Sequence, residues 1–201
     1  MPVLGEITRY AEAKVPTEYG TVRTVVYRVG ETTPAEEHVA LVVGDVAQGA
    51  EPVLCRVHSE CWTGEVMRSQ KCDCREQLDG AMSAIEAQGR GVVVYLRQEG
   101  RGIGLGNKVR AYALQSEGVD TVDANRILGF ADDARTYDVA ASILRDLGVS
   151  RVALMTNNPR KVQGLAAGGI EVAERVSLKA PPNEHNAEYL EVKARRMGHK
   201  L

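Results

Sequence analysis

The chain has 201 residues, of which 44% are hydrophobic and 26% are charged, and this composition excludes a disordered, collagen-like or coiled-coil chain. Its 25 Lys and Arg residues against 27 Asp and Glu residues leave a net charge of −2, which argues against a non-specific nucleic-acid coat. The first residues lack a secretory signal, and no apolar run approaches the ~20 residues that span a membrane. We therefore expect a cytoplasmic protein with no nucleic-acid or membrane partner.

The first part of the chain is predicted to be mostly strand. Apolar and polar residues alternate in three segments separated by polar turns, at 21–27, 38–44 and 52–58. A helix is expected over 75–88, where apolar side chains recur on one face and Gly89 supplies a stop. The continuous apolar run at 91–96 then predicts a buried strand.

Helices and strands alternate in the second part of the chain. The predicted elements are a helix over 106–117, a helix over 139–147, a strand over 151–156, a helix that begins at Pro159 and a strand over 170–178. A terminal helix over 189–197 follows a break that contains two prolines. We expect one domain over 1–201 of the mixed α/β (α+β) class, with strands first, then alternating strands and helices, and a flexible tail over about 180–201.

The cysteines give the strongest chemical signal. Cys61, Cys72 and Cys74 lie within fourteen residues, in a chain whose expected compartment disfavours disulfides. Three thiolates without an obvious fourth protein ligand suit a zinc ion that keeps one position open, as catalytic zinc does. A structural zinc closed by His58, or three reduced cysteines without metal, are the alternatives. Cys55 lies on the apolar face of a predicted strand and is interpreted as a small buried residue.

A glycine-rich segment at 97–108, RQEGRGIGLGNK, follows the predicted strand at 91–96. Glycines allow close approach of the backbone to a ligand, and a helix that begins near Asn107 would offer free amides to a phosphate. The cations within and beside this segment favour an anion site, and they are Arg97, Arg101, Lys108 and Arg110. A plain strand-to-helix turn is the alternative.

Two further segments carry charge near predicted helix starts. In TNNPRKVQG, Asn158 caps a helix whose first turn contains Arg160 and Lys161, which indicates either a phosphate site or a solvated surface helix. In DDARTYD, Asp133 and Arg135 stand two residues apart, and an ordinary ion pair is the simpler interpretation of that spacing. His58 precedes the cysteines and is equally explained as a ligand, an acid or base, or a structural histidine.

Taken together, these segments resemble GTP cyclohydrolase II. The blocks RVHSEC, KCDC, LRQEGRGIGL, NKVRAYALQ, DTVDAN, TNNPRKV and KARRMGH occur in the order of that family, from about Val15 to His199. The resemblance implies hydrolysis of GTP to 2,5-diamino-6-(5-phosphoribosylamino)pyrimidin-4(3H)-one, formate and pyrophosphate, the first step of riboflavin biosynthesis. It also implies a mixed α/β fold, a homodimer, one Zn2+ per chain, and Mg2+ with the triphosphate.

The resemblance further implies a role for individual residues. Zinc would be bound by Cys61, Cys72 and Cys74. Asp133 would be the proton acceptor, Arg135 the nucleophile, and Tyr112 a group that serves hydrolysis at the zinc. The residues implied to contact GTP are Arg56, Val57, His58, Ser59, Glu60, Gln77, Glu99, Gly100, Arg101, Thr121, Thr156 and Lys161.

The chain also departs from the family pattern at a few positions. Arg75 stands where Gly or another small residue is usual, Gly106 where Leu is usual, and Thr136 where Asp is common. These departures motivate an alternative, a divergent relative that opens the ring but retains the formyl group or serves a secondary pathway. A nucleotide-binding protein without turnover is a third hypothesis, against which the complete set of cysteines argues. We expect no additional N-terminal domain, and so not the fused form that also makes dihydroxybutanone phosphate.

Overall fold

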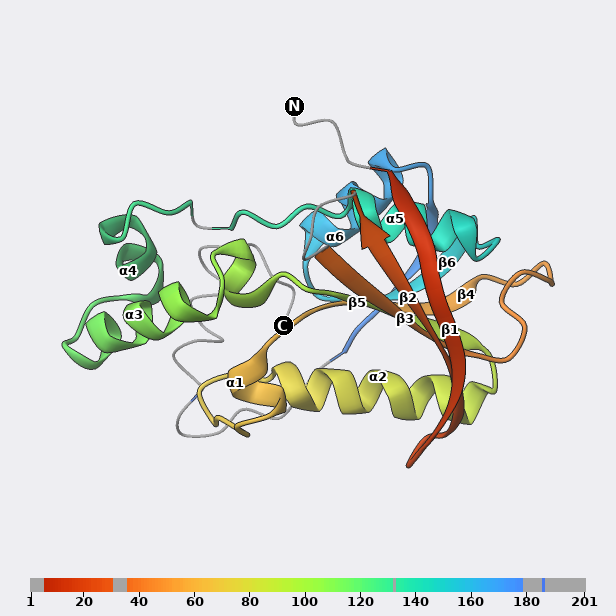
Figure 1. Cartoon of the computed structure of the whole chain (residues 1–201), viewed down its shortest axis with the longest axis horizontal. Helices are drawn as coiled ribbons and strands as arrows, with labels where there is room; N and C mark the ends of the chain where they lie inside the picture. The colour runs from red at the N-terminus through yellow and green to blue at the C-terminus, as the bar shows by residue number, and fades with distance from the viewer. Residues whose placement is uncertain (1–5, 31–35, 132, 179–185, 187–201) are drawn as a thin grey trace.

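The computed structural model describes residues 6–30, 36–131, 133–178 and 186, and these form a seven-stranded mixed sheet with helices on both faces (Figure 1). The strands are β1 (Ile7–Thr17), β2 (Gly20–Val29), β3 (Glu36–Val43), β4 (Val53–Ser59), β5 (Gly91–Leu96), β6 (Arg151–Met155) and β7 (Glu171–Val176). Their order in the sheet is β1-β2-β3-β5-β4-β6-β7. Neighbours from β1 through β5 are antiparallel, whereas β5, β4, β6 and β7 run parallel to one another.

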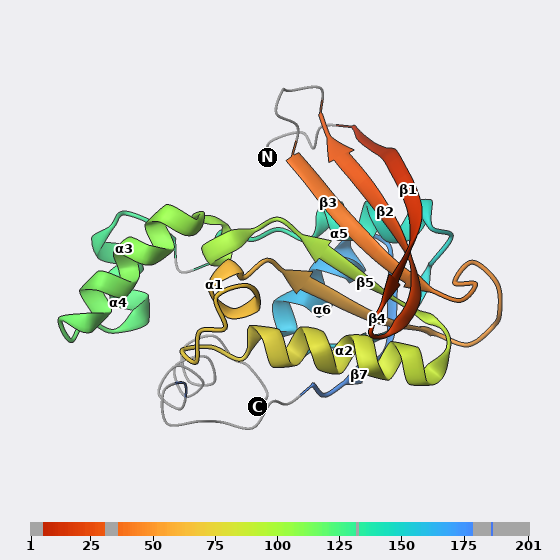
Figure 2. The same cartoon turned by 60° about the horizontal axis from the view of Figure 1, so that its bottom comes forward.

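The helices in the described part of the chain are α1 (Trp62–Glu65), α2 (Cys74–Gln88), α3 (Leu105–Ser116), α4 (Thr121–Ile127), α5 (Asp138–Asp146) and α6 (Pro159–Ala167), with a 3-10 turn η1 (Glu99–Gly102). Helix α2 covers one face of the sheet, and α5 and α6 cover the other (Figure 2). Helices α3 and α4 pack on each other and project from one end of the sheet as an arm (Figure 1).

Strand β4 shows how the sequence builds this three-layer arrangement. Leu54 packs with Ile85 of α2, while Cys55 and Val57 pack with Leu144 of α5 on the opposite face. Both faces of the strand are buried, as expected for a parallel strand covered by helices on two sides. Cys55 is fully buried, which confirms its interpretation as a packing residue.

Helices with strong local end signals are confirmed by the structure. Helix α2 ends at Gly89, whose φ of 69° is the left-handed conformation typical of a glycine stop. Helix α6 begins at Pro159, and the side chain of Asn158 caps it by accepting a hydrogen bond from the backbone N–H of Arg160 at 2.9 Å. The predicted mixed α/β (α+β) class is also confirmed, since one sheet combines an antiparallel and a parallel half.

Strand β1 was not predicted, and neither were the short helices α1 and α4. Ala11, Ala13 and Val15 alternate with Glu12 and Lys14, but the run is short, and every residue of β1 except Ile7 is exposed, so the alternation does not mark a buried face. The strand forms through antiparallel backbone hydrogen bonds with β2, and a sequence pattern does not show such bonds. The helix predicted over 189–197 lies outside the described residues, as does nearly all of the predicted tail over 180–201. No described helix is long and apolar enough to cross a membrane.

Candidate active site and metal centre

The candidate site lies at the carboxyl ends of three adjacent parallel strands, β5, β4 and β6. These strands end at Leu96, Ser59 and Met155, so the segments that follow them meet at one edge of the sheet. A pocket of about 1040 Å³, counted out to its open mouth, lies there and is completed by residues of α3. The sequence-predicted residues that line it are Arg56, His58, Ser59, Glu60, Cys61, Cys72, Cys74, Gln77, Glu99, Gly100, Arg101, Tyr112, Arg135, Thr156 and Lys161.

Cys61, Cys72 and Cys74 come together at one side of this pocket. Their Sγ atoms all lie within 4.8 Å of one another, and those of Cys61 and Cys72 are 3.7 Å apart. Gly64 of α1 lies against them, and a Cβ there would stand 2.9 Å from the Cys72 Sγ and 3.2 Å from the Cys61 Sγ. The donor set and the space left by Gly64 fit a metal ion that prefers thiolate ligands, such as zinc.

Cys61 is the most acidic thiol of this group. Its pKa lies well below the usual range, because the thiols of Cys72 and Cys74 hydrogen bond to its sulfur and the ammonium of Lys108 lies nearby. The Lys108 Nζ to Cys61 Sγ distance is 3.1 Å. The pKa of Cys72 is raised to about 11, chiefly because its proton is shared with Cys61. The site therefore stabilises at least one thiolate, the form that binds a metal.

His58 is not part of the cysteine cluster. Its Nε2 lies 2.8 Å from Oε1 of Glu65, and burial lowers its pKa to about 4, so the imidazole is neutral at neutral pH. Glu65 also accepts hydrogen bonds from the Tyr95 hydroxyl at 2.6 Å and from the Cys61 backbone N–H at 3.0 Å. Within the described residues the metal-type cluster contains only cysteines, which argues against a zinc closed by His58. The sequence analysis did not identify Glu65.

The glycine-rich segment forms η1 and is pinned by Glu99. The Glu99 carboxylate accepts hydrogen bonds from the backbone N–H of Gly100 and of Trp62, each at 2.6 Å, and from Lys108 Nζ at 2.8 Å. Gly100 and Arg101 both adopt a φ of 62°, a conformation that is unusual for an arginine. The segment therefore connects β5 to α3 through a loop whose conformation is constrained by the hydrogen bonds of Glu99.

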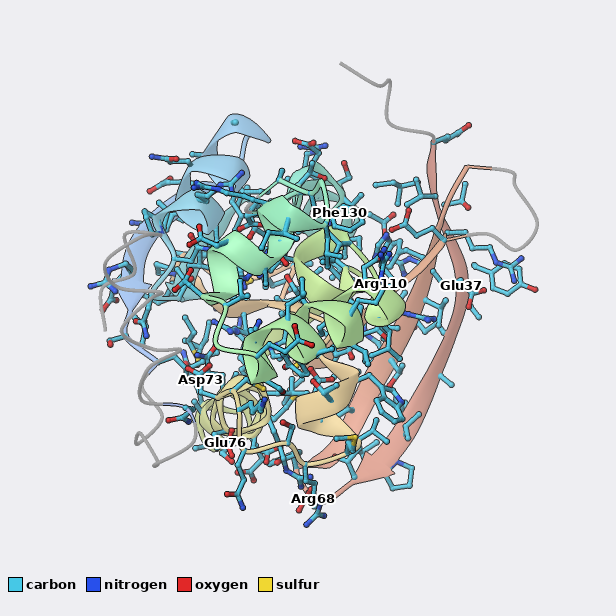
Figure 3. All side chains as sticks on the ribbon, turned by 90° about the vertical axis from the view of Figure 1, so that its left-hand side faces the viewer. Glu37, Arg68, Asp73, Glu76, Arg110 and Phe130 are labelled. Atoms are coloured by element: carbon cyan, nitrogen blue, oxygen red, sulfur yellow. The ribbon has the colours of Figure 1, made fainter. Side chains whose placement is uncertain are left out.

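Only two of the four cations predicted to form an anion site here reach the pocket. Arg97 pairs with Glu60 at 3.3 Å, and Arg110 projects from the exposed side of α3, where it bonds to Asn107 (Figure 3). Lys108 and Arg101 line the pocket, and the anions beside Lys108 are Glu99 and the Cys61 sulfur.

Arg56 and Gln77 both line the pocket and are hydrogen bonded to each other. Arg56 donates from Nη1 to the Met155 carbonyl at 2.9 Å and from Nη2 to the Gln77 Oε1 at 2.5 Å. Gln77 in turn donates to Asp73 Oδ2 at 2.5 Å. Burial lowers the pKa of Arg56 to about 10, which still leaves a protonated guanidinium at neutral pH. The two predicted contact residues are thus fixed by each other before any ligand arrives.

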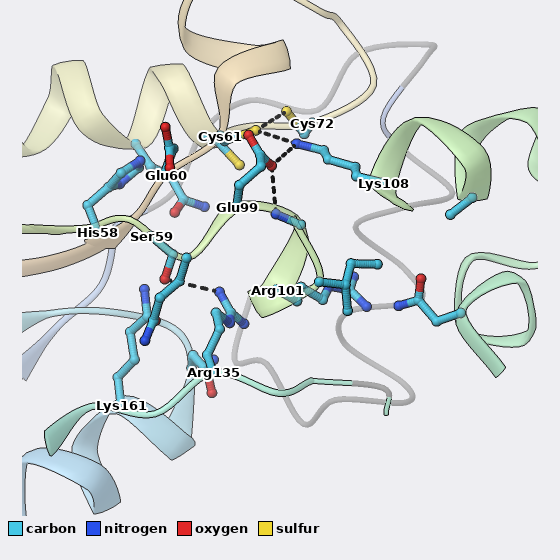
Figure 4. Close-up of a pocket in the computed structure, with 18 of the residues that line it drawn as sticks. His58, Ser59, Glu60, Cys61, Cys72, Glu99, Arg101, Lys108, Arg135 and Lys161 are labelled. Carbon is cyan, nitrogen blue, oxygen red and sulfur yellow. Dashed lines mark hydrogen bonds and ion pairs between the residues drawn. The ribbon is translucent and has the colours of Figure 1, made fainter. Parts of the chain in front are cut away.

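Arg135 and Lys161 lie on the side of the pocket away from the cysteines (Figure 4). Arg135 forms a two-pronged ion pair with Asp133, at 2.9 Å from Nε to Oδ1 and 2.8 Å from Nη2 to Oδ2. Burial alone would raise the pKa of Asp133, but the hydrogen bonds and charge of Arg135 outweigh it and hold that pKa below its usual value. Lys161, at the start of α6, is buried and donates to the Val57 carbonyl at 2.7 Å.

Two of the sequence-predicted residues whose side chains the structure describes, Val57 and Asp133, do not line the pocket. The side chain of Val57 is in the hydrophobic core, and Asp133 stands behind Arg135. Thr121 begins α4, and its side chain lies outside the described part of the chain. Arg75, a departure from the family pattern, pairs with Asp79 on α2 and is also absent from the pocket lining. Polar lining residues that the sequence analysis did not identify are Gln98, Gln115, Asn125 and Asn157.

Comparisons with known proteins agree with these features. The family model described as GTP cyclohydrolase II matches residues 8–177. A protein named GTP cyclohydrolase-2 from Haemophilus influenzae (strain PittGG) is 50% identical over 98% of this chain and 90% of its own length. The Riboflavin biosynthesis protein RibBA of Bacillus subtilis (strain 168) is 52% identical over 97% of this chain, but the chain spans about half, 48%, of that relative.

A solved two-domain 3,4-dihydroxy-2-butanone 4-phosphate synthase, RibBX from A. baumannii, aligns with 87% of this chain and 40% of its own, with a TM-score of 0.47 and 22% identity. At this TM-score and identity, the likeness supports no conclusion about this chain. The family model covers most of the chain, and the Haemophilus relative is matched over nearly its full length. The chain belongs to the GTP cyclohydrolase II family.

Proposed function

We propose that this chain hydrolyses GTP, opening the imidazole ring and releasing formate and pyrophosphate to give 2,5-diamino-6-(5-phosphoribosylamino)pyrimidin-4(3H)-one, the first step of riboflavin biosynthesis. The observation that carries the proposal is the division of one pocket into two sides. Cys61, Cys72 and Cys74 lie on one side, and Arg135 and Lys161 lie on the other (Figure 4). The reaction needs two chemically different hydrolyses, one at C8 of guanine and one at the α-phosphorus.

The cysteine side is suited to the ring. Cys61, Cys72 and Cys74 would hold one Zn2+, which when bound supplies Lewis acidity and an activated water at the ring carbon. Tyr112 lines the same pocket, with Lys71 Nζ and Lys108 Nζ 5.3 Å and 5.9 Å from its ring centre. Its hydroxyl would donate a hydrogen bond to the formyl oxygen during release of formate.

The opposite side is suited to the triphosphate. The ammonium of Lys161 would neutralise phosphate charge, and Mg2+ would accompany the two leaving phosphates. Thr156 and Asn158 lie at the start of α6 and line the pocket. The hydrogen bond from the Asn158 N–H to Thr156 Oγ1, at 3.0 Å, fixes the turn that presents them.

Arg135 has two alternative roles on this side. As a nucleophile, its nitrogen would form a bond to the α-phosphorus while the bond to the pyrophosphate oxygen breaks and Asp133 takes the guanidinium proton. As a clamp, it would stay protonated and hold the phosphate while water attacks. Asp133 is positioned for the first role, since it already accepts two hydrogen bonds from the guanidinium.

The alternative of a relative that retains the formyl group loses its main motivation. Arg75 pairs with Asp79 at 3.3 Å on α2, so it does not add charge to the pocket. Tyr112 is present in the pocket. We further infer that the chain acts as one catalytic domain, assembles as a homodimer, and works in the cytoplasm.

Incubation of the purified, zinc-loaded chain with GTP and Mg2+ tests the proposal by product mass. We expect the diaminopyrimidine phosphoribosyl product together with formate and pyrophosphate. A product that keeps the formyl group would favour the divergent relative. Unchanged GTP in the presence of a full complement of zinc would favour a binding protein without turnover.

A further inference from the structure

Lys108 occupies a position that the proposed reaction does not explain. Its ammonium lies 3.1 Å from the Cys61 Sγ and 2.8 Å from the Glu99 Oε1, and both contacts are drawn in Figure 4. The Lys108 and Glu99 side chains are only 13% and 8% exposed, so this is a buried ion pair beside a sulfur. A buried lysine is retained only when its charge has close partners, and the partners here are the Glu99 carboxylate and the Cys61 sulfur.

We propose that Lys108 is a positioning residue of the metal centre, which orients the Cys61 thiolate for metal binding and ties the cysteine side of the pocket to the glycine-rich loop. The inference rests on the proposed function only in taking zinc as the metal. Lys108 touches neither the reacting carbon nor the phosphate in this account. It acts through the sulfur that it contacts.

Charge balance gives the first reason. Three thiolates and one divalent cation carry a net charge of −1, and this charge would lie in a largely buried site. An ammonium 3.1 Å from one sulfur, although shared with Glu99, lowers the cost of that charge and donates a charge-assisted hydrogen bond to the sulfur. Groups that bond to metal ligands in this way orient them, and their loss weakens metal binding.

The contacts of Glu99 give the second reason. One carboxylate oxygen accepts from Lys108 and from the Gly100 N–H, and the other accepts from the N–H of Trp62, the residue directly after Cys61. The Lys108–Glu99 pair thus contacts the segment around Cys61 at two points, the Cys61 Sγ and the Trp62 backbone N–H. Because the Glu99 carboxylate accepts hydrogen bonds from all three donors, it links the glycine-rich loop to the segment around Cys61.

The glycine-rich loop is shaped to admit Lys108. A Cβ at Gly100 would stand 3.1 Å from the Lys108 Cβ, and the φ of Gly100 is positive. The Lys108 backbone N–H bonds to the Gly104 carbonyl at 3.1 Å, in the first turn of α3. The backbone of Lys108 is therefore fixed at the start of α3, and its side chain lies against Gly100 and extends to the Cys61 sulfur.

Metal affinity of Lys108→Met provides the test, with Arg110→Met on the same helix as the matched control. We expect Lys108→Met to bind zinc about 10- to 100-fold more weakly in competition with a chelator. In the cobalt-loaded protein, we also expect its sulfur-to-metal charge-transfer band to shift. Arg110→Met should match the parent in both measurements, because Arg110 is exposed and bonds only to Asn107 among the contacts that the described residues show.

If Lys108→Met does not fold, Lys108→Gln tests the role of Lys108 instead, because it keeps a hydrogen-bond donor but removes the charge. We expect this variant to lose at least tenfold in zinc affinity. Zinc affinity and a cobalt band equal to those of the parent, in whichever variant folds, would overturn the inference. Neither readout uses GTP. A chain that shows the predicted metal effects but does not convert GTP would contradict only the proposed function.

Discussion

Arg135 is tied to Asp133 through two of its three guanidinium nitrogens. Nε and Nη2 donate to the carboxylate, while Nη1 lies 3.5 Å from the Ser59 hydroxyl, which lines the pocket. Arg160 adds a second cation, 3.2 Å from Asp133 Oδ2. The carboxylate therefore fixes the plane of the guanidinium, with Nη1 on the side of Ser59.

Replacement of Arg135 by Lys separates the two roles proposed for this residue. The variant keeps a positive charge but loses the planar fork and its nitrogens. If Arg135 attacks the α-phosphorus, we expect pyrophosphate release to be nearly abolished. Substantial pyrophosphate release from the variant would show that Arg135 is a clamp and that water attacks directly, and a guanylyl adduct located on Arg135 after rapid quench would show the reverse.

His58 predicts a pH dependence of stability. Burial lowers its pKa from 6.5 in the unfolded chain to about 4 in the folded one, so between these values the unfolded chain binds more protons. The contribution is fully present above pH 6.5 and is lost as the pH falls toward 4. By pH 5.5 the free energy of unfolding should have decreased by on the order of 1 kcal/mol from this residue.

The variant His58→Gln isolates that contribution, since Gln can still donate to Glu65 but does not titrate. We expect urea unfolding at pH 7.5 and 5.5, at one zinc concentration, to show a smaller decrease for the variant than for the parent chain. Equal decreases in the two proteins would mean that His58 is protonated in the folded state near its ordinary pKa.

At the scale of single elements, the short helix α1 shapes the metal centre through Gly64. Because a Cβ at this position would stand 2.9 Å from the Cys72 Sγ, we expect Gly64→Ala to displace a ligand and weaken zinc binding by about tenfold or more. Gly106→Ala in α3 is the control, since no atom lies within 4 Å of its added Cβ. That variant should keep its zinc and gain up to about 0.5 kcal/mol of stability.

Metal content after dialysis, together with a urea unfolding curve for each variant, checks this pair. Equal zinc retention in Gly64→Ala and Gly106→Ala would show that the cysteine cluster has more room than the described geometry gives it.

The elements that the sequence predicts are those whose signals are local. The stop at Gly89 and the cap at Asn158 are properties of a few neighbouring residues, and the structure has α2 ending and α6 beginning there. Strand β1 is defined by its backbone pairing with β2, and its apolar residues at 11, 13 and 15 are exposed rather than packed on a core. Helix α1 is a single turn whose place is fixed by the cysteine loop around it.

The same distinction applies to the site. The cysteines were predicted from their spacing, and Arg135 from the family resemblance. The structural role of Lys108 was not, because its partner Cys61 is 47 positions away and only packing of α3 against the cysteine loop brings them together. Glu65 was missed for a related reason, since it ends α1 while its partner Tyr95 lies on β5, 30 positions along the chain.

At the scale of the whole molecule, the site follows from the order of the strands. Strand β4 lies between β5 and β6; the chain passes from β4 to β5 through α2 on one face and from β5 to β6 through α5 on the other. The three carboxyl ends therefore surround one pocket. The segment after β4 carries Cys61 and the segment after β6 carries Lys161, so the sheet would place the proposed ring chemistry and the proposed phosphate chemistry after different strands.

Parallel measurement of formate and pyrophosphate from Cys72→Ser, incubated with GTP and Mg2+, tests that separation most directly. Loss of a thiolate ligand should remove the zinc and abolish formate, while the groups around Arg135 stay in place. We predict that pyrophosphate release persists, so that the ratio of pyrophosphate to formate rises far above that of the parent chain. Full zinc occupancy with undiminished formate release, or the loss of both products from a folded variant that still binds GTP, would contradict the account.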